Sequence, residues 1–477
     1  MTGDYTAMTA STPLPEVQDT MVVDPDLLRR FDRPGPRYTS YPTADRLVEA
    51  FGPDQYRLSL EKRVIGGFRR PLSLYVHLPF CDTICYYCGC NKIITKDHGR
   101  SAKYLRYLRK EIELVSPLTS KGERVTQLHW GGGSPTFLNQ AELTELMQII
   151  REHFSLAADG EYSIEVDPRS ASRDTVTLLA SLGFNRISVG VQDFDAEVQR
   201  AVNRIQSEDQ TRAVIAAARA CGFKSVNMDL IYGLPKQNAE RFAKTLEKVL
   251  DISPDRIALY NYAHLPTVFK PQRRINEKEL PSAEGRIELF TKGIRTLTQA
   301  GYVYIGMDHF AKPEDELAVA QRRGHVHRNF QGYSTRAECD LIGLGISAIG
   351  SVGPAYIQNF RTLEEYYGSL DSGVLPVMRG LALNSDDLVR RAVIQALMCH
   401  FSLSFRAIEI AHLIDFRRYF ATELQELKEY GALGLVDVDD EGITITPRGR
   451  LIVRAICMLF DQYLRNAEQR ARYSKVI

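Results

Sequence analysis

The alternation of short apolar segments with longer amphipathic ones constrains the fold of this 477-residue chain more than any other feature. Short segments rich in Val, Ile, Leu and Tyr, each followed by Gly, Pro, Asp or Asn, predict strands at residues 72–78, 125–130, 162–166, 186–191, 225–231 and 256–262. Helical patterns lie between them at residues 101–115, 140–153, 173–181, 210–220 and 239–250. This alternation predicts an α/β fold with a parallel sheet that is covered by helices.

The number of these units indicates a barrel. About six to eight such units would curve into a full or partial (β/α) barrel, and barrel active sites collect at the C-terminal ends of the strands. We therefore expect the functional residues directly after the predicted strands.

The pattern changes at about Leu383, where the alternation gives way to helices. Helices are expected at residues 386–400, 405–412 and 416–430, followed by a β-hairpin at 434–446 and an amphipathic helix at 448–466. Helix–helix–hairpin is the outline of a winged helix. The expected organisation is an N-terminal arm and cap segment (1–70), a barrel (71–382) and a mainly helical, winged-helix-like C-terminal domain (383–477).

A winged helix commonly binds DNA, but the charge of the chain does not favour that function. Sixty Lys and Arg against 59 Asp and Glu leave a net charge of +1, so a broad nucleic-acid-binding face has no support. We therefore expect no nucleic-acid partner, and the C-terminal domain should contact protein or cover the active site. The charge-rich surface shows no obvious apolar stripe, which favours a monomer.

The N-terminal segment and the longest uncharged run both argue against export and against a membrane span. The first twenty residues contain acids and prolines and do not resemble a secretory or organelle signal. The uncharged run between Asp340 and Arg361 is long enough to span a bilayer, but its glycines and polar residues favour a buried strand with Gly-rich loops. We expect a cytoplasmic protein without a membrane partner, whose thiols stay reduced unless a metal binds them.

Four cysteines, Cys81, Cys85, Cys88 and Cys90, follow the first predicted strand with the spacing Cys-x3-Cys-x2-Cys-x-Cys. Thiolates this close are mainly ligands for a soft metal or a cluster. Structural zinc usually takes two separated ligand pairs, and ferredoxin clusters use other spacings. The favoured interpretation is that the first three thiolates hold three irons of a [4Fe–4S] cluster and leave the fourth iron open. Structural zinc and uninvolved thiols remain the alternatives, and Cys90 is not needed as a ligand.

The cysteine spacing, with Tyr87 directly before the third cysteine, resembles the signature of radical S-adenosylmethionine (SAM) enzymes, and the three glycines at 131–133 are its usual companion. Four further segments, RYTSYPTA (37–44), YVHLPFC (75–81), HWGGGSPT (129–136) and RNFQGY (328–333), resemble the oxygen-independent coproporphyrinogen III oxidases (dehydrogenases). The resemblance runs from about Arg33 to the C-terminus. Ser134 departs from the Thr that is common in those enzymes, although both side chains carry a hydroxyl.

A related haem-chaperone group is the alternative within the same superfamily. It shares the barrel and the first three cysteines but lacks the fourth cysteine and the Arg-Tyr-Thr-Ser-Tyr-Pro-Thr segment, both of which are present here. A zinc-containing winged-helix regulator is the alternative from another class. It would contain zinc and no iron, and it would bind duplex DNA.

The resemblance implies a [4Fe–4S] cluster, two SAM molecules and coproporphyrinogen III as the substrate. It also implies a reduced electron donor such as flavodoxin or ferredoxin, and a terminal electron acceptor that the sequence leaves unknown. Reductive cleavage of SAM gives a 5′-deoxyadenosyl radical, which abstracts a β-hydrogen from a propionate side chain. Loss of carbon dioxide and one electron leaves a vinyl group. Two such reactions give protoporphyrinogen IX for haem synthesis.

The resemblance further assigns residues to the site. It implies the cluster ligands Cys81, Cys85 and Cys88, and the cofactor-binding residues Tyr75, Tyr87, Gly132, Gly133, Ser134, Glu165, Gln192, Arg204, Asp229, Ala263 and Ile349. It places the residues Tyr75, His77, Cys90, Phe330 and Gln331 near the substrate or the chemistry.

Physical arguments support some of these assignments more than others. Tyr75 and His77 share one face of a predicted strand that leads into the cysteine loop. Glycines let a ligand approach the backbone closely. A carboxylate at Glu165 suits ribose hydroxyls or an ammonium group. The alternatives are a core role for His77 and a surface ion pair for Arg204. Only the resemblance distinguishes Ala263 and Ile349 from core residues. No motif distinguishes the possible propionate partners Arg33, Arg37 and Lys92 from solvated charges.

Overall fold

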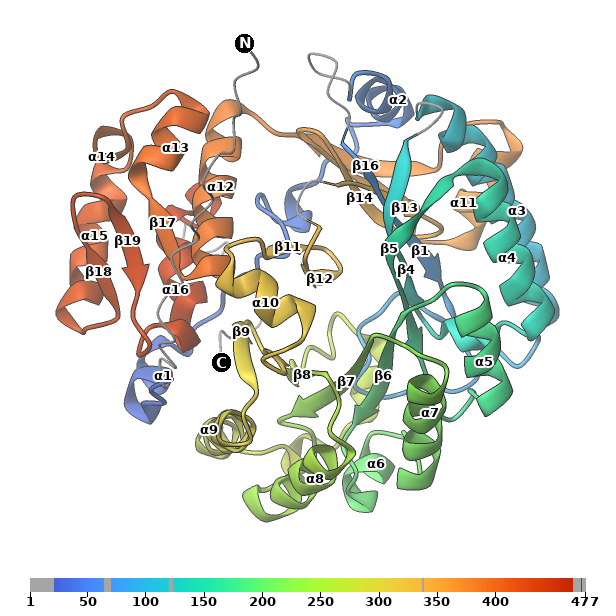
Figure 1. Cartoon of the computed structure of the whole chain (residues 1–477), viewed down its shortest axis with the longest axis horizontal. Coiled ribbons are helices and arrows are strands. Elements are labelled where there is room, and N and C mark those ends of the chain that lie inside the picture. The colour runs from blue at the N-terminus through green and yellow to red at the C-terminus, as the bar shows by residue number, and fades with distance from the viewer. Residues whose placement is uncertain (1–20, 64–69, 120–122, 337–338, 466–472, 474–477) are drawn as a thin grey trace, which may run out of the picture.

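The structure, a computed structural model, describes residues 21–63, 70–119, 123–336, 339–465 and 473, so residues 1–20 of the expected arm and part of its cap segment lie outside the described residues (Figure 1). A curved sheet runs through the molecule. Its parallel strands are β1 (Leu72–Leu78), β4 (Arg124–Gly132), β5 (Ser155–Val166), β6 (Arg186–Gln192), β7 (Ser225–Tyr232), β8 (Arg256–Asn261) and β13 (Asp340–Leu344). Antiparallel strands extend both edges, namely β14 (Ile349–Val352), β15 (Ala355–Asn359), β16 (Val377–Ala382), β9 (Val303–Gly306) and β10 (His309–Ala311).

The order of the twelve strands, β16-β15-β14-β13-β1-β4-β5-β6-β7-β8-β10-β9, is that of an open, curved sheet and confirms the partial barrel. The central strands are buried along most of their length, as expected where helices cover a parallel sheet. The uncharged run after Asp340 forms three strands, β13, β14 and β15, where the sequence analysis expected one buried strand with Gly-rich loops.

Helices lie on the convex side of the sheet (Figure 1). They are α3 (Gly99–Val115), α4 (Gln140–His153), α5 (Arg173–Ser181), α6 (Ala196–Ala201), α7 (Glu208–Ala220), α8 (Ala239–Ile252), α9 (Ala283–Gln299) and α11 (Leu363–Asp371). Several begin after a Ser or Asn whose side chain accepts a hydrogen bond from the first turn, which satisfies a backbone donor that the helix leaves free. These capping residues are Asn139, Ser172, Ser207, Asn238 and Ser282.

Short elements fill the concave side and the cysteine loop. They are β2 (Phe80–Cys81), β3 (Ile93–Ile94), α10 (Glu316–Arg322), β11 (His327–Asn329) and β12 (Gly332–Ser334). β11 and β12 form a hairpin that lies between the barrel and the C-terminal domain (Figure 1). Strand β5 is longer than expected, because its polar first half pairs with the start of β4 through a register shift.

The C-terminal part confirms the winged-helix outline. It contains α12 (Ser385–His400), α13 (Phe405–His412), α14 (Phe416–Tyr419), α15 (Ala421–Ala432) and the sheet strands β17 (Ser402–Ser404), β18 (Val436–Val438) and β19 (Gly442–Ile445). The helix expected over residues 416–430 is interrupted at Phe420, which leaves the helical conformation. Phe420 is fully buried between Phe416 and Phe460, so aromatic packing overrides helix continuity.

The amphipathic helix expected at 448–466 is wrong. The chain instead forms α16 (Val453–Cys457) between short 3-10 helices, η6 (Arg450–Ile452), η7 (Met458–Phe460) and η8 (Gln462–Leu464), and residue 466 lies outside the described residues. Residues 451–458 are buried on every side, so they have no exposed face to present. Tight turns allow this segment to fill the space beside α12.

The N-terminal arm connects the C-terminal domain to the barrel. It contains α1 (Pro25–Phe31), the 3-10 helix η1 (Ala44–Arg46) and α2 (Pro53–Glu61). Arg30 pairs with Glu429 at 2.6 Å at one end of the arm. At the other end, Val48 forms a β-bridge with Gly380 of β16. The arm therefore lies across the concave side of the sheet.

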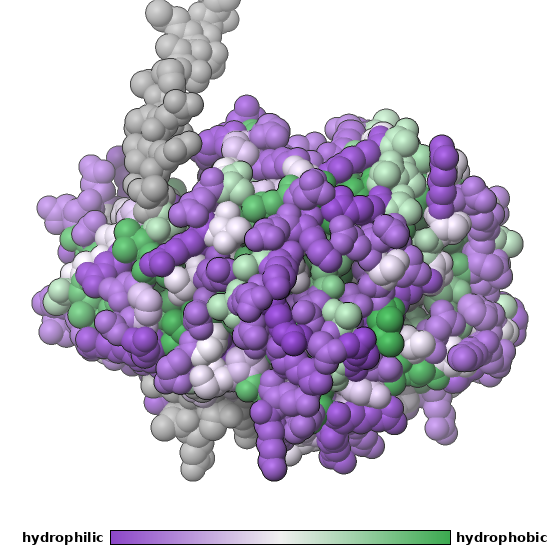
Figure 2. Space-filling model, turned by 90° about the horizontal axis from the view of Figure 1, so that it is seen from below, coloured by the Kyte–Doolittle hydropathy of each residue, from purple (hydrophilic) through white to green (hydrophobic). Residues whose placement is uncertain are grey.

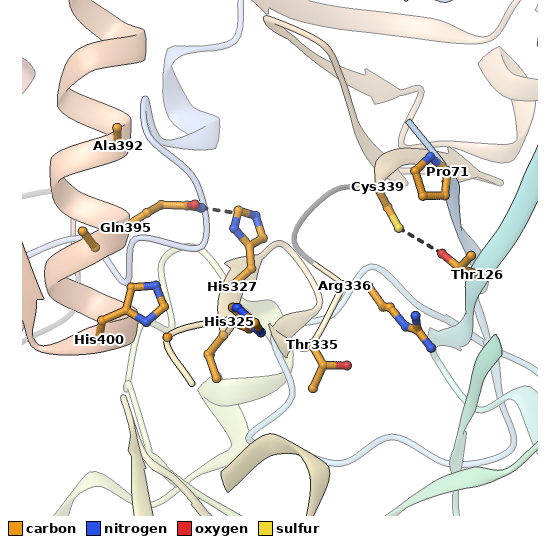
Figure 3. Close-up of a pocket in the computed structure, with 13 residues that line it drawn as sticks. Pro71, Thr126, His325, His327, Thr335, Arg336, Cys339, Ala392, Gln395 and His400 are labelled. Atoms are coloured by element: carbon orange, nitrogen blue, oxygen red, sulfur yellow. Dashed lines mark hydrogen bonds between the residues drawn. The ribbon is translucent and has the colours of Figure 1, made fainter. Parts of the chain in front are cut away.

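A cavity of about 490 Å³ lies between the barrel and α12 (Figure 3). His327, Gln395 and His400 line one side, and Pro71 and Thr126 line the other. Pro71 precedes β1 and Thr126 is near the start of β4, so this cavity is at the opposite end of the strands from the cysteines.

The outer surface is mainly polar on the face seen in Figure 2, where hydrophobic residues form small separate areas. Among the described residues, no helix combines the length and the apolar character that crossing a bilayer requires.

Candidate active site

The three cysteines of the motif lie in the loop that leaves the C-terminal end of β1, where the barrel argument places an active site. Cys81 ends β2, and Cys85 and Cys88 follow in the loop. The loop is fixed to the end of α6, because the side chain of Asn203 donates a hydrogen bond of 2.7 Å to the carbonyl oxygen of Ile84.

Two guanidinium groups face the buried sulfur of Cys85. Arg169 Nη2 lies 3.6 Å from the sulfur and Arg204 Nη1 lies 3.7 Å from it, so two positive charges lie beside this sulfur. Burial and then the negative charges of Cys88 and Cys85 raise the pKa of Cys81 to about 12. Three thiolates side by side would repel one another, and a cationic cluster bound among them would offset this repulsion.

The third cysteine has its own polar partners. A hydrogen bond with Cys90, helped by the Lys92 ammonium group, lowers the pKa of Cys88 to about 6 against the effect of burial. Lys92 also donates to the carbonyl oxygen of Cys88 at 2.9 Å. In the described part of the chain, no three His, Cys, Asp or Glu side chains converge on a position for one ion. Three closely spaced thiol side chains are the donor set that a soft-metal cluster prefers, so the residues fit a cluster.

Tyr75 and His77 are brought together on β1. The Nε2–H of His77 donates to the carbonyl oxygen of Asn91 at 2.9 Å, so Nδ1 accepts from the Tyr75 hydroxyl at 3.0 Å. Burial lowers the pKa of His77 and keeps the ring neutral. The ring of His129 stacks on Tyr75 with 5.8 Å between centroids, which extends this group to β4.

Glu165 joins the same group from β5. Its carboxylate accepts from the backbone N–H of Gly132 at 3.2 Å and lies 3.3 Å from Nε2 of His129. Burial raises the pKa of Glu165, but His129 and the Gly132 amide outweigh burial and leave the pKa below its usual value. The carboxylate is therefore charged and suited to an ammonium or hydroxyl ligand.

The glycine run is required by packing within the chain itself. Gly132 has a φ of +115°, and a Cβ there would lie 2.5 Å from the His77 ring. A Cβ on Gly133 would lie 2.6 Å from the carbonyl group of Pro79. Ser134 follows, buried, with its hydroxyl 3.1 Å from that of Thr136. These glycines let the end of β4 approach the start of the cysteine loop.

Arg204 belongs to a buried network rather than to a surface ion pair. It donates to the carbonyl oxygen of Gly190 at 2.6 Å and pairs with Asp167 at 3.3 Å. The side chain of Gln192 lies beside the same Gly190 and has a left-handed backbone φ of +71°. The Nε atom of Arg204 is buried without a hydrogen-bond partner in the described part of the chain, which leaves a donor for a ligand.

Asp167 and Arg169 are functional candidates that the sequence analysis missed. Arg169 pairs with Asp167 at 2.6 Å, and Asp167 also pairs with Arg204, so both arginines near Cys85 are held by one carboxylate. Their signal in the sequence is the Asp-Pro-Arg that directly follows β5, at the strand end where barrel sites form.

Asp229 forms a third polar position, on β7. Ser188 donates to one of its oxygens at 3.0 Å and Asn227 donates to the other at 2.8 Å. Burial and the charge of Glu165 raise the pKa of Asp229 to about 6, which indicates that the two carboxylates share one polar region.

The other predicted site residues are Tyr87, Ala263, Ile349, Phe330 and Gln331, and they lie in different parts of the fold. Gln272 donates to the carbonyl oxygens of both Tyr87 and Ala263, at 3.0 and 3.1 Å, and so joins the cysteine loop to the end of β8. Ile349 begins β14, beside β13. Phe330 and Gln331 form the turn of the β11–β12 hairpin, where Phe330 packs edge-on against Tyr356 of β15 rather than on the cysteine loop.

The suggested propionate partners have partners of their own. Arg33 donates to the hydroxyl of Tyr430 at 2.7 Å, Lys92 caps the cysteine loop, and Arg37 pairs with Asp308 at 3.3 Å. Arg37 also lies over the ring of Tyr260 of β8, with 5.7 Å between its guanidinium carbon and the ring centroid.

Comparisons with known proteins identify the family of this chain. The sequence model of the radical SAM superfamily matches residues 75–249, and that of the HemN C-terminal domain matches residues 383–452. The oxygen-independent coproporphyrinogen III oxidase of Pseudomonas aeruginosa is 54% identical over 462 residues, which cover 96% of this chain and 100% of that protein. The chain belongs to the oxygen-independent coproporphyrinogen III oxidase family.

Two further members support the assignment. The oxygen-independent coproporphyrinogen III oxidase of Escherichia coli is 49% identical over 451 residues, which cover 94% of this chain and 98% of that protein. The solved structure of coproporphyrinogen III oxidase (HemN) from Escherichia coli, described as a radical SAM enzyme, matches with a TM-score of 0.88 at 48% identity, over 93% of this chain and 99% of that one. Membership of the radical SAM superfamily implies a [4Fe–4S] cluster and SAM.

Proposed function

We infer that this protein converts coproporphyrinogen III to protoporphyrinogen IX without oxygen, by oxidative decarboxylation of two propionate side chains to vinyl groups. The observation that carries this function is the full-length identity to named coproporphyrinogen III oxidases, together with three thiols at a barrel strand end that two arginines face. A haem-binding chaperone is not favoured, because the relatives matched over the whole chain are oxidases.

The side chains at the active site suit a [4Fe–4S] cluster and SAM. Cys81, Cys85 and Cys88 would hold the cluster, with Arg169 and Arg204 as charge partners of Cys85. When bound, the cluster and SAM supply a one-electron reduction that generates a carbon radical able to abstract hydrogen. We propose that two SAM molecules bind. This count is supported by the extent of one polar region, which reaches from Glu165 on β5 to Asp229 on β7 and so offers polar side chains at more than one position.

The side chains of the protein orient the ligands and exclude water. Glu165 offers a charged carboxylate, and Arg204 offers an unpartnered N–H at Nε. Neutral His77 holds the Tyr75 hydroxyl in place through Nδ1 and cannot easily take up a proton, because burial opposes its charged form. Preorganised groups of this kind hold a reactive species in one orientation and prevent side reactions.

The test is an anaerobic assay of the reconstituted protein with a reductant, SAM and coproporphyrinogen III. We expect 5′-deoxyadenosine and a divinyl product, with methionine released. Haem binding without either product would instead identify a chaperone. A colourless protein that contains zinc and no iron would contradict the cluster itself.

The role of the cysteines is tested by two variants. We expect Cys85→Ala to lose the cluster, because the substitution removes one of its three sulfur ligands and leaves Arg169 and Arg204 without the sulfur that they face. Cys90→Ala should keep a near-normal iron and sulfide content, because three thiolates suffice. Iron and sulfide analysis after reconstitution measures both. An intact cluster in Cys85→Ala would refute this ligand assignment.

We further propose the partners and organisation of the protein. A reduced flavodoxin or ferredoxin serves as donor, supported by the cysteine loop, whose residues Thr83, Gly89 and Cys90 are exposed. The protein acts as a cytoplasmic monomer without nucleic acid, supported by a mainly polar face and balanced charge (Figure 2). The division into arm (1–70), barrel (71–382) and C-terminal domain (383–477) is supported by the twelve-stranded sheet, which ends at Ala382.

A further inference from the structure

Arg328 is a buried cation that has no carboxylate partner among the residues that the structure describes. It lies in β11 and is 4% exposed, and its Nε and Nη1 atoms are both buried without a hydrogen-bond partner. Of the residues that the structure describes, only Arg328 has two side-chain atoms in this condition, and none of the ion pairs found there includes it. Burying a guanidinium group without a compensating anion is costly.

Several other buried arginines among the described residues are paired with carboxylates. Arg63 pairs with Asp340 at 2.9 Å and also with Glu123. Arg390 pairs with Glu423 at 2.9 Å. Because buried charges in proteins are normally paired, the exception at Arg328 indicates that a ligand supplies its anion.

The surroundings of Arg328 are a row of rings that leads to a second arginine. Its guanidinium carbon lies 4.7 Å from the centroid of the Tyr333 ring. Tyr333 contacts His309 edge-on at 5.3 Å, and His309 contacts Tyr260 at 5.7 Å. Arg37 lies over Tyr260 at the other end of the row. Arg37 is paired with Asp308, so only the Arg328 end has an unmatched charge.

This row adjoins the polar centre of the barrel. Tyr260 lies on β8, opposite Ile231 of β7, two residues along the strand from Asp229. Burial and then the positive charges of Arg328 and Arg37 lower the pKa of His309 to about 3, which indicates a positive potential along the row. The buried Nε2 of Gln331, in the turn of the same hairpin, also has no hydrogen-bond partner.

Arg328 faces away from the cavity between the barrel and α12. His327 points into that cavity, toward Gln395 (Figure 3). Because side chains alternate along a strand, Arg328 points to the other side, where Tyr333 lies. The unmatched charge therefore belongs to the barrel side of the hairpin.

We propose that Arg328 binds a propionate carboxylate of the tetrapyrrole and fixes the orientation of the macrocycle against the Tyr333–His309–Tyr260 row. Guanidinium grips a carboxylate through several fixed N–H donors, and aromatic side chains provide apolar contact for a macrocycle. The inference rests on the proposed function, since it names a binding residue for that substrate.

Equilibrium binding tests the proposal without turnover. The reconstituted protein is titrated with coproporphyrin III, the stable oxidised tetracarboxylate, and with its uncharged tetramethyl ester, and ligand fluorescence is followed. Loss of a charge-assisted hydrogen bond predicts that Arg328→Gln weakens coproporphyrin III binding roughly ten- to hundredfold. Arg328→Lys should bind with intermediate affinity, and binding of the ester should be unchanged in both variants.

Arg336→Gln is the matched control, because it removes the same charge from a partly buried arginine on the other side of the hairpin, which lines the α12 cavity. Its coproporphyrin III affinity should equal that of the wild type. Cluster absorbance and thermal melting confirm that each variant is folded. An affinity of Arg328→Gln within twofold of the wild type, or an equal loss for the ester, would overturn the inference.

The proposed function can fail separately. If the wild type forms the divinyl product while Arg328→Gln binds coproporphyrin III normally, only the role of Arg328 is wrong. If the wild type neither binds coproporphyrin III nor forms product, the proposed function is wrong and the inference is wrong with it.

Discussion

Glu111 is a buried carboxylate in α3 that organises the loop after β13. It accepts hydrogen bonds from the backbone N–H of Gly345 at 2.7 Å and from the side chains of Asn359 and Tyr366, each at 2.6 Å. Burial outweighs these three donors and raises the pKa of Glu111 from 4.5 to about 7. The structure therefore favours the protonated form more than the unfolded chain does.

This shift predicts a pH dependence of stability. A carboxyl group whose pKa is raised in the folded state contributes its stability below about pH 4.5 and loses it as the pH rises to about 7. Each pKa unit corresponds to about 1.4 kcal/mol, so the wild type should lose a few kcal/mol relative to Glu111→Gln between pH 5 and pH 8. Thermal melting of both proteins across this range measures the difference. Parallel pH profiles would contradict the assigned cause.

Candidate site residues could be predicted from the sequence where they belong to a recognisable segment at the end of a strand. The cysteines, Glu165 and Asp229 could be named because each lies at or near the end of a predicted strand in a recognisable segment. Asp167 and Arg169 were missed although they stand beside Glu165, because Arg169 faces Cys85, 84 residues away in sequence, and Asp167 holds Arg169 and Arg204 by ion pairs. Arg328 was quoted only as part of a motif, since its missing partner is visible only in three dimensions.

At the scale of elements, the end of β4 packs directly on the turn between β1 and β2. Gly133 donates its backbone N–H to the carbonyl oxygen of Leu78 at 2.8 Å, and a Cβ on Gly133 would meet the backbone of Pro79 and Phe80 at 2.6 and 2.7 Å. Neither neighbour can rotate away, because both contacts are with backbone atoms.

Gly133→Ala should therefore destabilise the protein by about 1–3 kcal/mol, the usual cost of overpacking. It should also weaken SAM binding, because the strand end must move relative to the cysteine loop. Thermal melting and SAM titration measure the two effects. The control is Gly368→Ala in α11, where a Cβ meets nothing within 4 Å and added helix propensity should stabilise slightly. Equal melting temperatures for the two variants would contradict the packing argument.

Element types were predictable where periodicity and capping agree. Strand β1 and helix α5 have the predicted bounds, because an apolar run or a Ser cap marks their ends. The final helix was predicted wrongly, since apolar residues at 451–458 are buried on all sides and tight turns pack them better than a regular helix. Hydrophobic periodicity predicts a helix with one buried face. It does not predict the conformation of a segment that is buried on all sides.

At the scale of the whole molecule, the arm ties the C-terminal domain to the concave side of the barrel. Arg454 of α16 donates to the carbonyl oxygens of Pro36 at 3.0 Å and Gly35 at 2.5 Å. Tyr38 donates to Asp461 at 3.0 Å from the same stretch of arm. These contacts hold Arg37, which lies between them in sequence, over Tyr260.

Arg454→Met keeps most of the side-chain volume but leaves both carbonyl oxygens without this donor. We expect a loss of about 1–3 kcal/mol in stability and faster proteolysis within the arm. A raised KM for coproporphyrinogen III should follow, because Arg37 loses its support. Arg418→Met, an exposed substitution on the same domain, is the control. Unchanged proteolysis of the arm in Arg454→Met would show that other contacts hold it.

The sequence by itself determined the order of strands and helices, the strand ends where the site forms, and the cysteine spacing. These are local properties, set by side-chain periodicity, capping and motif spacing. Only the tertiary structure decided which charges meet. It placed Arg169 and Arg204 on Cys85 and closed the arm on the C-terminal domain, and within the described residues it left two buried N–H groups of Arg328 without hydrogen-bond partners. The physical reason is that burial and pairing depend on residues far apart in sequence, which local patterns do not encode.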